Sequence, residues 1–116
     1  MKLNHLNLTV DDVPAAKRFL EQHFGLRPYG AGKQNFDVLF DDDDLVLTLI
    51  GVGRSSTVSY PKTFHIGFIQ PSEERVDEIN QRLRDDGFEV EQPSRQHGAW
   101  TFYFQAPGGF TVEVLC

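Results

Sequence analysis

The chain has 116 residues, of which 40% are hydrophobic and 24% are charged, a size and composition typical of one globular domain spanning residues 1–116. Its net charge of −6 excludes the basic surface that binding to a phosphate backbone requires, so no nucleic-acid partner is expected. The longest apolar run, residues 45–52, is far shorter than the roughly 20 residues that span a bilayer, so no membrane partner is expected either.

The location of the protein is predicted from its N-terminal residues and its cysteine usage. Residues 1–12 lack the basic and then apolar pattern of a secretory signal. The single cysteine, Cys116, cannot form an internal disulfide, which fits a reducing compartment. Both features favour a cytoplasmic location.

The first half of the chain predicts a strand, a helix and two further strands. The opening strand alternates apolar and polar residues, as expected of a strand covered on one face, and this alternation directs His5 and Asn7 to the same face. The helix follows an aspartate cap and stops at Gly25. A run of four aspartates forms a solvated turn between the last two strands. In order, these elements are expected at residues 3–10, about 12–24, 36–40 and 45–52.

The second half repeats this order of elements. A strand, a helix capped by Ser72 and three strands are expected at residues 63–69, 73–86, 88–90, 100–105 and 110–115. His65 follows His5 by 60 residues, and the helix-ending Gly25 and Gly87 lie 20 and 22 residues after their own histidine. We therefore predict an α+β fold of two βαβββ modules, about residues 1–58 and 63–116.

Glu113 is the acidic residue whose position needs an explanation. It lies between Val112 and Val114 in a strand that should be half buried, where a carboxylate is costly unless it is paired, protonated or bound to a cation. Alternation in the strand at residues 63–69 places His65 on the face opposite the helix, as it does for His5.

Two chemical interpretations of these three residues are open. Two histidines and one carboxylate on equivalent strand faces match the ligand set of a divalent transition metal that leaves positions free for substrate. Alternatively, His5 and His65 are hydrogen-bonded strand residues, and Glu113 pairs with Arg95 or Lys62.

Three segments resemble a known superfamily along essentially the whole chain. They are the opening NHLNL at residues 4–8, the central FHIGF at residues 64–68 and the ending YFQAPGGFTVE at residues 103–113. With the repeated βαβββ order, they are similar to the vicinal oxygen chelate superfamily, which groups glyoxalase I, extradiol dioxygenases, fosfomycin resistance thiol transferases and bleomycin resistance proteins. The resemblance implies cupped mixed sheets with the helices outside, and a homodimer.

The resemblance implies a metal site. The first strand of each module supplies a histidine and the last strand a glutamate, so His5, His65 and Glu113 are expected to bind a divalent ion, for which iron, manganese, nickel and zinc are all compatible. Glyoxalase I uses a further glutamate where this chain has Thr48, a neutral hydroxyl that cannot act as a general base. Glyoxalase I activity is therefore not expected, and the ligand set resembles that of the dioxygenases and thiol transferases.

The remaining site residues are expected to orient a small-molecule substrate. Catalytic roles are predicted for Tyr103, as a hydrogen-bond donor to an oxyanion, and for Thr48. Substrate contacts are predicted for Asn7, Thr48, Trp100 and Tyr103. The expected activity is that of a dioxygenase, a lyase or isomerase, or a thiol transferase acting on an oxygen-chelating substrate.

Bleomycin resistance proteins supply the alternative function. They share the fold without the metal ligands and hold a flat drug in an aromatic cleft between two chains, so a metal-free binder of small molecules or antibiotics is the second reading of this sequence. In several members of the superfamily the two modules that complete one site come from different chains. In that arrangement His5 of one chain meets His65 and Glu113 of the other.

Overall fold

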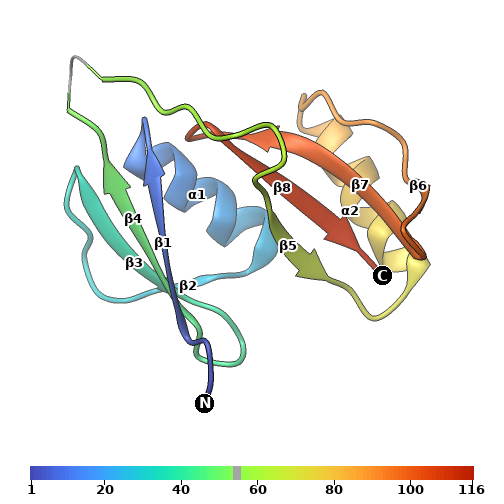
Figure 1. Cartoon of the computed structure of the whole chain (residues 1–116), viewed down its shortest axis with the longest axis horizontal. Helices are drawn as coiled ribbons and strands as arrows, with labels where there is room; N and C mark the ends of the chain where they lie inside the picture. The colour runs from blue at the N-terminus through green and yellow to red at the C-terminus, as the bar shows by residue number, and fades with distance from the viewer. Residues whose placement is uncertain (54–55) are drawn as a thin grey trace. The chain divides into compact units, whose positions relative to one another are not determined.

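The computed structural model describes residues 1–53 and 56–116, so residues 54 and 55 of the first predicted module lie outside the described residues. The chain divides into two compact units, residues 1–60 with 106–110 and residues 61–105 with 111–116. Within the described residues, each unit contributes a four-stranded sheet and one helix (Figure 1). The predicted α+β fold with two βαβββ modules is confirmed.

The first unit places its opening strand beside its closing strand. Its elements are β1 (His5–Val10), α1 (Val13–Phe24), β2 (Arg27–Pro28), β3 (Phe36–Phe40) and β4 (Val46–Gly51). The strand order is β1-β4-β3-β2, with β1 parallel to β4 and the other neighbours antiparallel. The register pairs Asn7 with Thr48, so these two residues lie side by side.

Helix α1 is fixed by its caps and by one apolar stripe. The Asp12 side chain accepts a hydrogen bond from the Ala15 backbone N–H at 3.0 Å, and Gly25 ends the helix with φ of 67°. The buried core of this unit is formed by apolar residues of α1 and of the strands: Ala16, Phe19, Leu20, Leu8, Val10, Leu39, Leu47 and Leu49. Because side chains alternate along β1, His5 and Asn7 lie on the sheet face opposite this core.

A buried ion pair joins α1 to β3. Lys17 Nζ lies 3.2 Å from Asp37 Oδ2, and Asp37 is only 4% exposed. The Val38 backbone N–H donates to Asp37 Oδ1 at 2.8 Å. Gly32 lies so close that a Cβ added there would fall 1.7 Å from Asp37 Oδ2. This position therefore requires glycine because any side chain would displace the buried carboxylate.

The second unit repeats the topology of the first. Its elements are β5 (Ile66–Ile69), α2 (Glu73–Asp85), β6 (Ser94–Gln96), β7 (Ala99–Ala106) and β8 (Phe110–Leu115). The strand order is β5-β8-β7-β6, with β5 parallel to β8, and the register pairs Gly67 with Glu113. Ser72 caps α2 by accepting a hydrogen bond from the Arg75 N–H at 3.2 Å. Neither described helix has the length or apolar content needed to cross a membrane.

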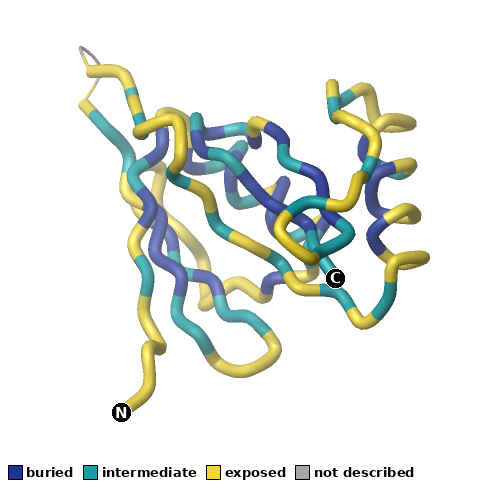
Figure 2. Tube along the Cα trace, turned by 45° about the vertical axis from the view of Figure 1, so that its right-hand side comes forward, coloured by how far each residue is buried: buried dark blue, intermediate teal, exposed yellow. Residues whose placement is uncertain are grey.

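The core of the second unit lies between α2 and one face of its sheet. Buried residues along α2 and the strands are visible as dark segments in Figure 2, and the apolar ones are Val76, Ile79, Leu83, Phe102, Phe104, Val112 and Val114. The predicted strand at residues 88–90 is wrong. This segment is not a strand, and Asn80 Nδ2 of α2 donates to the Glu91 carbonyl just beyond it at 2.7 Å. The strand that follows α2 is β6, farther along the chain.

Candidate functional site

A row of three polar side chains crosses the first unit's sheet on the face opposite α1. This His5 row consists of His5, Asn7 and Thr48. The Thr48 hydroxyl donates to Asn7 Oδ1 at 2.7 Å, and Thr48 Oγ1 lies 3.3 Å from His5 Nε2. Because the only hydroxyl proton of Thr48 goes to Asn7, Thr48 Oγ1 accepts from His5, and His5 carries a proton on Nε2. The structure therefore brings together three of the predicted site residues.

The His5 row lies in an apolar surrounding on the same sheet face. The register pairs Thr48 with Val38 and the neighbouring Ile50 with Phe36. Ile50 and Phe36 are 42% and 41% exposed, although both are large hydrophobic residues. Tyr29 adds a ring packed edge-on against Phe40, with centroids 5.7 Å apart. This face combines a polar centre with exposed apolar side chains, as small-molecule sites do.

The second unit gathers four side chains, the His65 cluster, which consists of His65, Thr101, Tyr103 and Glu113. His65 Nε2 lies 3.3 Å from Glu113 Oε2, and the Thr101 hydroxyl donates to Glu113 Oε1 at 2.9 Å. Glu113 is 9% exposed, so its carboxylate is compensated by these neighbours. Gly67 of β5 lies opposite Glu113, and a Cβ there would stand 3.8 Å from Glu113 Oε2.

Both ring nitrogens of His65 face oxygen atoms. Nδ1 lies 3.0 Å from the Thr63 carbonyl, which can only accept, so Nδ1 carries a proton. Nε2 then faces the Glu113 carboxylate either as an N–H donor in the imidazolium form or with its lone pair beside a cation. His65 is therefore held between two oxygen atoms, one at each ring nitrogen.

Tyr103 completes the His65 cluster. Its ring packs edge-on against His65, with centroids 5.3 Å apart and an interplanar angle of 88°. A hydrogen bond to Glu113, with smaller contributions from desolvation and from the negative charge of Glu113, raises the pKa of Tyr103 above its ordinary value. The Tyr103 hydroxyl therefore donates its single proton to the Glu113 carboxylate.

Trp100 lies apart from the His65 cluster. Side chains alternate along β7, so Trp100 shares a face with the buried Phe102, whereas Thr101 and Tyr103 share the opposite face. The Trp100 indole N–H donates to Asp77 of α2 at 2.7 Å, and the Arg95 guanidinium lies over its ring at 5.5 Å. The structure does not bring Trp100 to the other predicted site residues of its unit.

The expected partner of Glu113 under the non-metal interpretation is different in the structure. Arg95 is paired with Glu73 of α2. Glu113 is paired with His65 instead. The prediction that Arg95 could compensate Glu113 is therefore wrong, because β6 and α2 direct the guanidinium to the helix.

The three predicted metal ligands are divided between the units, with His5 in the first and His65 and Glu113 in the second. Among residues 1–53 and 56–116, no three His, Cys, Asp or Glu side chains form a group that could hold a metal ion.

Two contacts in the His65 cluster were not predicted from the sequence, the one made by Thr101 and the one made by the Thr63 carbonyl. Thr101 could have been found, because alternation along β7 places it on the same face as Tyr103, but the Thr63 carbonyl leaves no sequence signal.

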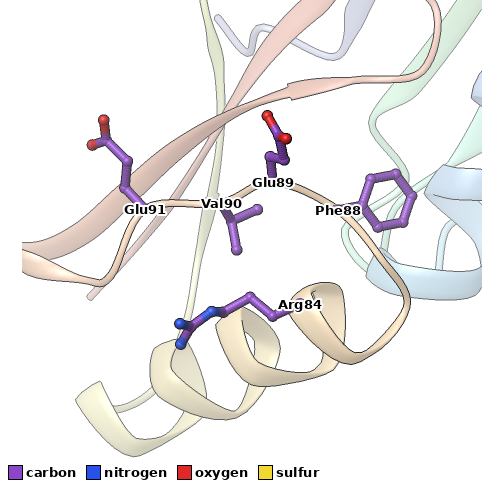
Figure 3. A pocket seen from close by; sticks show the side chains of 5 residues that line it. All are labelled: Arg84, Phe88, Glu89, Val90 and Glu91. Carbon is purple, nitrogen blue, oxygen red and sulfur yellow. The ribbon is translucent and has the colours of Figure 1, made fainter.

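A separate open pocket of about 610 Å³ lies between the end of α2 and the segment that follows it. Figure 3 shows its lining side chains, which are Arg84, Phe88, Glu89, Val90 and Glu91. None of the predicted site residues lines this pocket. The candidate functional residues are therefore the His5 row in the first unit and, separately, the His65 cluster in the second.

Comparison with known proteins identifies the superfamily. The sequence model of the Glyoxalase/Bleomycin resistance protein/Dioxygenase superfamily matches residues 2–114, and the chain belongs to this superfamily. A solved structure of a possible glyoxalase from Bacillus cereus is 57% identical, with a TM-score of 0.90, over 100% of this chain and 99% of that chain. The resemblance inferred from the sequence motifs is confirmed.

More distant structures share the fold alone. A lactoylglutathione lyase from Agrobacterium tumefaciens is 23% identical, with a TM-score of 0.77, over 98% of this chain and 92% of that chain. A glyoxylase/bleomycin resistance protein/dioxygenase domain from Frankia sp. is 18% identical, with a TM-score of 0.82, over 99% of this chain and 96% of that chain. A search of curated proteins gave no match.

Proposed function

We propose that this protein is a divalent-metal-dependent enzyme that acts on a small substrate with two neighbouring oxygen atoms. The observation that supports this proposal is the geometry of His65, whose Nε2 faces Glu113 Oε2 at 3.3 Å while its Nδ1 faces the Thr63 carbonyl at 3.0 Å. A histidine whose Nδ1–H is held by a carbonyl presents the Nε2 lone pair as a ligand. An imidazole and a carboxylate directed at each other fit a transition metal ion, with His5 as the third ligand.

The reaction is proposed to combine a Lewis acid with hydrogen bonds from the chain. Iron, manganese, nickel or zinc bound by His5, His65 and Glu113 would polarise the substrate oxygens. The single hydroxyl proton of Tyr103 goes to Glu113 in this structure, and we propose that it turns to an oxyanion of the substrate when Glu113 binds the ion instead. Thr48 and Asn7 orient the substrate through the polar centre of the His5 row.

The class of reaction is narrowed by Thr48. The register of β1 and β4 places Thr48 where the second unit has Glu113, so the first unit offers a neutral hydroxyl instead of a carboxylate base. The similarity to a possible glyoxalase supports one of the metal-dependent reactions of this superfamily. We do not propose the isomerisation that glyoxalase I catalyses. Oxygen-dependent ring cleavage, thiol transfer and other lyase or isomerase reactions are the candidates.

We also propose that the active form is a cytoplasmic homodimer. Each chain carries two of the three ligands in the His65 cluster and the third in the His5 row. In a homodimer, His5 of one copy completes the ligand set with His65 and Glu113 of the other copy. Binding of the metal and dimerisation are then expected to depend on each other.

The test is elemental analysis of the protein purified without a histidine tag, with the mass of the same sample measured by light scattering. Near-stoichiometric metal in a dimer is expected. Absence of metal after incubation with manganese, iron or zinc would overturn the proposal. Catechol cleavage and thiol addition are the first activities to assay on the metal-loaded protein.

Subunit mixing tests the shared site. His5→Ala and Glu113→Ala are each expected to lose metal when purified alone. When the two variants are unfolded and refolded together, the mixed dimer contains one complete ligand set and is expected to recover metal. If the mixture stays metal-free while refolded wild type recovers its metal, the ligands of one site do not come from two chains.

The second candidate function is metal-free binding of an aromatic ligand. The observation that favours it is the exposed apolar face around the His5 row, where Ile50 and Phe36 are 42% and 41% exposed and Tyr29 is 70% exposed. Under this function, a flat ligand binds with the same affinity after His65→Ala and Glu113→Ala. Calorimetric titration with aromatic compounds separates the two candidates.

A further inference from the structure

Glu113 is held by a buried hydroxyl that the sequence motifs do not include. The Thr101 side chain is 1% exposed and donates to Glu113 Oε1 at 2.9 Å. A glutamate has three rotatable side-chain bonds, and nothing in the β8 backbone itself directs its carboxylate toward His65. Thr101 removes this freedom by fixing one of the two carboxylate oxygens.

The hydroxyl of Thr101 has a second acceptor. Its oxygen also lies 3.0 Å from the Val114 carbonyl, but the hydroxyl has a single proton to donate. An ionised carboxylate is the stronger acceptor, because a hydrogen bond to a charged group is stronger than one between neutral groups. Thr101 therefore favours the carboxylate, and the carbonyl keeps the buried hydroxyl satisfied when Glu113 moves away.

Fixing Oε1 determines what the other oxygen does. With Oε1 held by Thr101, Glu113 Oε2 lies 3.3 Å from His65 Nε2. His65 is held in the same way from its far side by the Thr63 carbonyl. Each of the two side chains is thus restrained by one hydrogen bond, and the remaining atoms, Glu113 Oε2 and His65 Nε2, face each other.

We propose that Thr101 is a positioning residue that holds Glu113 Oε1 and so keeps Oε2 available as a metal ligand beside His65. This inference rests on the proposed metal-dependent function. Thr101 is itself buried on the sheet and acts on the metal only through Glu113. Its role is distinct from that of Tyr103, which bonds the same carboxylate but is partly exposed.

The test compares Thr101→Val, which has nearly the same shape but no hydroxyl, with Thr101→Ser, which keeps the hydroxyl. The first readout is the affinity of the full-length protein for Co²⁺, measured by calorimetry. Thr101→Val is expected to bind Co²⁺ about 10- to 100-fold more weakly than wild type, as is typical when the hydrogen-bond partner of a metal ligand is removed, while Thr101→Ser retains most of the affinity. Wild-type affinity in Thr101→Val would overturn the proposal.

The second readout needs no metal. Crystal structures of the metal-free wild type and Thr101→Val are compared at the distance between Glu113 Oε2 and His65 Nε2. This distance is expected to be longer in Thr101→Val than in wild type. An unchanged distance overturns the proposal. If wild type binds no Co²⁺, the metal-dependent function fails, while this distance still decides whether Thr101 positions Glu113. If Thr101→Val does not fold, Thr101→Ala removes the same hydroxyl without the second γ-methyl group.

Discussion

The two units have the same topology but different chemistry at equivalent positions. In the first, β1 pairs with β4 so that Asn7 lies beside Thr48, and in the second, β5 pairs with β8 so that Gly67 lies beside Glu113. His5 and His65 each precede these positions by two residues. The repeated fold therefore gives positions 48 and 113 the same place in their sheets. The residue type then decides the chemistry, a neutral hydroxyl at Thr48 and a carboxylate at Glu113.

The residue on the adjacent strand differs between the units in the same way: β1 places Asn7 beside Thr48, and β5 places Gly67 beside Glu113. Asn7 fills the space beside Thr48 and accepts its hydroxyl proton, which leaves His5 as an Nε2–H donor. Gly67 offers no polar side chain to Glu113, and the carboxylate is paired with His65 instead. The two histidines therefore have different partners: Thr48 Oγ1 faces Nε2 of His5, whereas the Thr63 carbonyl faces Nδ1 of His65 and Glu113 faces its Nε2.

The largest expected effect comes from removing the ionic members of the second unit. His65→Ala and Glu113→Ala are each expected to weaken divalent-metal binding by more than about 100-fold, because each removes a ligand of the ion itself. Elemental analysis after dialysis against trace metal measures the loss.

Thr48→Ala is the matched control in the first unit. It removes a neutral hydroxyl from the position equivalent to Glu113. Because this hydroxyl contacts His5 but is not itself a ligand, the variant is expected to lose less metal than Glu113→Ala. Equal metal loss in Thr48→Ala and Glu113→Ala would contradict the proposal that Glu113 is a metal ligand and Thr48 is not.

A smaller effect, on the free energy of unfolding, is expected when Thr48 is replaced by the glutamate that the second unit has at the equivalent position. Thr48→Glu places a carboxylate at a position that is 9% exposed, where it faces the amide oxygen of Asn7. The metal-free variant is expected to lose about 1–3 kcal/mol of unfolding free energy, the typical cost of a poorly compensated buried polar group. Urea unfolding with and without Ni²⁺ measures this cost and its recovery on metal binding.

Thr48→Gln controls for the size of the new side chain without its charge. It is expected to be destabilised and to recover less unfolding free energy with Ni²⁺ than Thr48→Glu does. Thr48→Glu with wild-type stability in the absence of metal would mean that the first unit already compensates a carboxylate at this position.

The smallest effect concerns the titration of Tyr103. Its pKa is raised by the hydrogen bond to Glu113, so the protonated phenol is favoured in the folded state. Its contribution to stability is therefore complete below the ordinary tyrosine pKa near 10.0 and is lost as pH rises through the raised value. Ultraviolet absorbance of phenolate in wild type, minus that of Tyr103→Phe, isolates this titration.

Glu113→Gln tests the cause of the raised pKa. Removing the negative charge is expected to move the titration of Tyr103 back toward its ordinary value. A Tyr103 that titrates at the ordinary tyrosine pKa of 10.0 in wild type would show that the hydrogen bond to Glu113 is absent in solution.

Most of the fold was predictable because its signals are local or periodic. Strand alternation and helix caps located both helices and most of the strands, although not β2 and β6, and the spacing of His5 and His65 revealed the repeat. The segment at residues 88–90 was mispredicted because its apolar residues resemble a strand, while the deciding contact comes from Asn80 of α2. No pattern within a short segment reports such a contact from another element.

The candidate site was predictable to a lesser degree. Alternation predicted His65 and Glu113 on one side of two strands. His65 lies just before β5, which begins at Ile66 and not at residue 63, but the structure brings it within 3.3 Å of Glu113. The sequence could not indicate that Arg95 pairs with Glu73, or that Thr101 restrains Glu113, because both contacts depend on how β6 and β7 lie relative to their neighbours.

Asp37 and Glu113 show how the protein distributes electrostatic potential between its two buried acids. Asp37 lies beside Lys17, a permanent counterion at neutral pH, so this pair is neutral as a whole and exerts little attraction on ions in solution. The hydroxyls of Thr101 and Tyr103 stabilise the charge of Glu113 without cancelling it, and His65 supplies a positive charge only when it is protonated. The second carboxylate therefore leaves a negative potential that a mobile cation can neutralise, whereas the first serves only to tie a helix to a sheet.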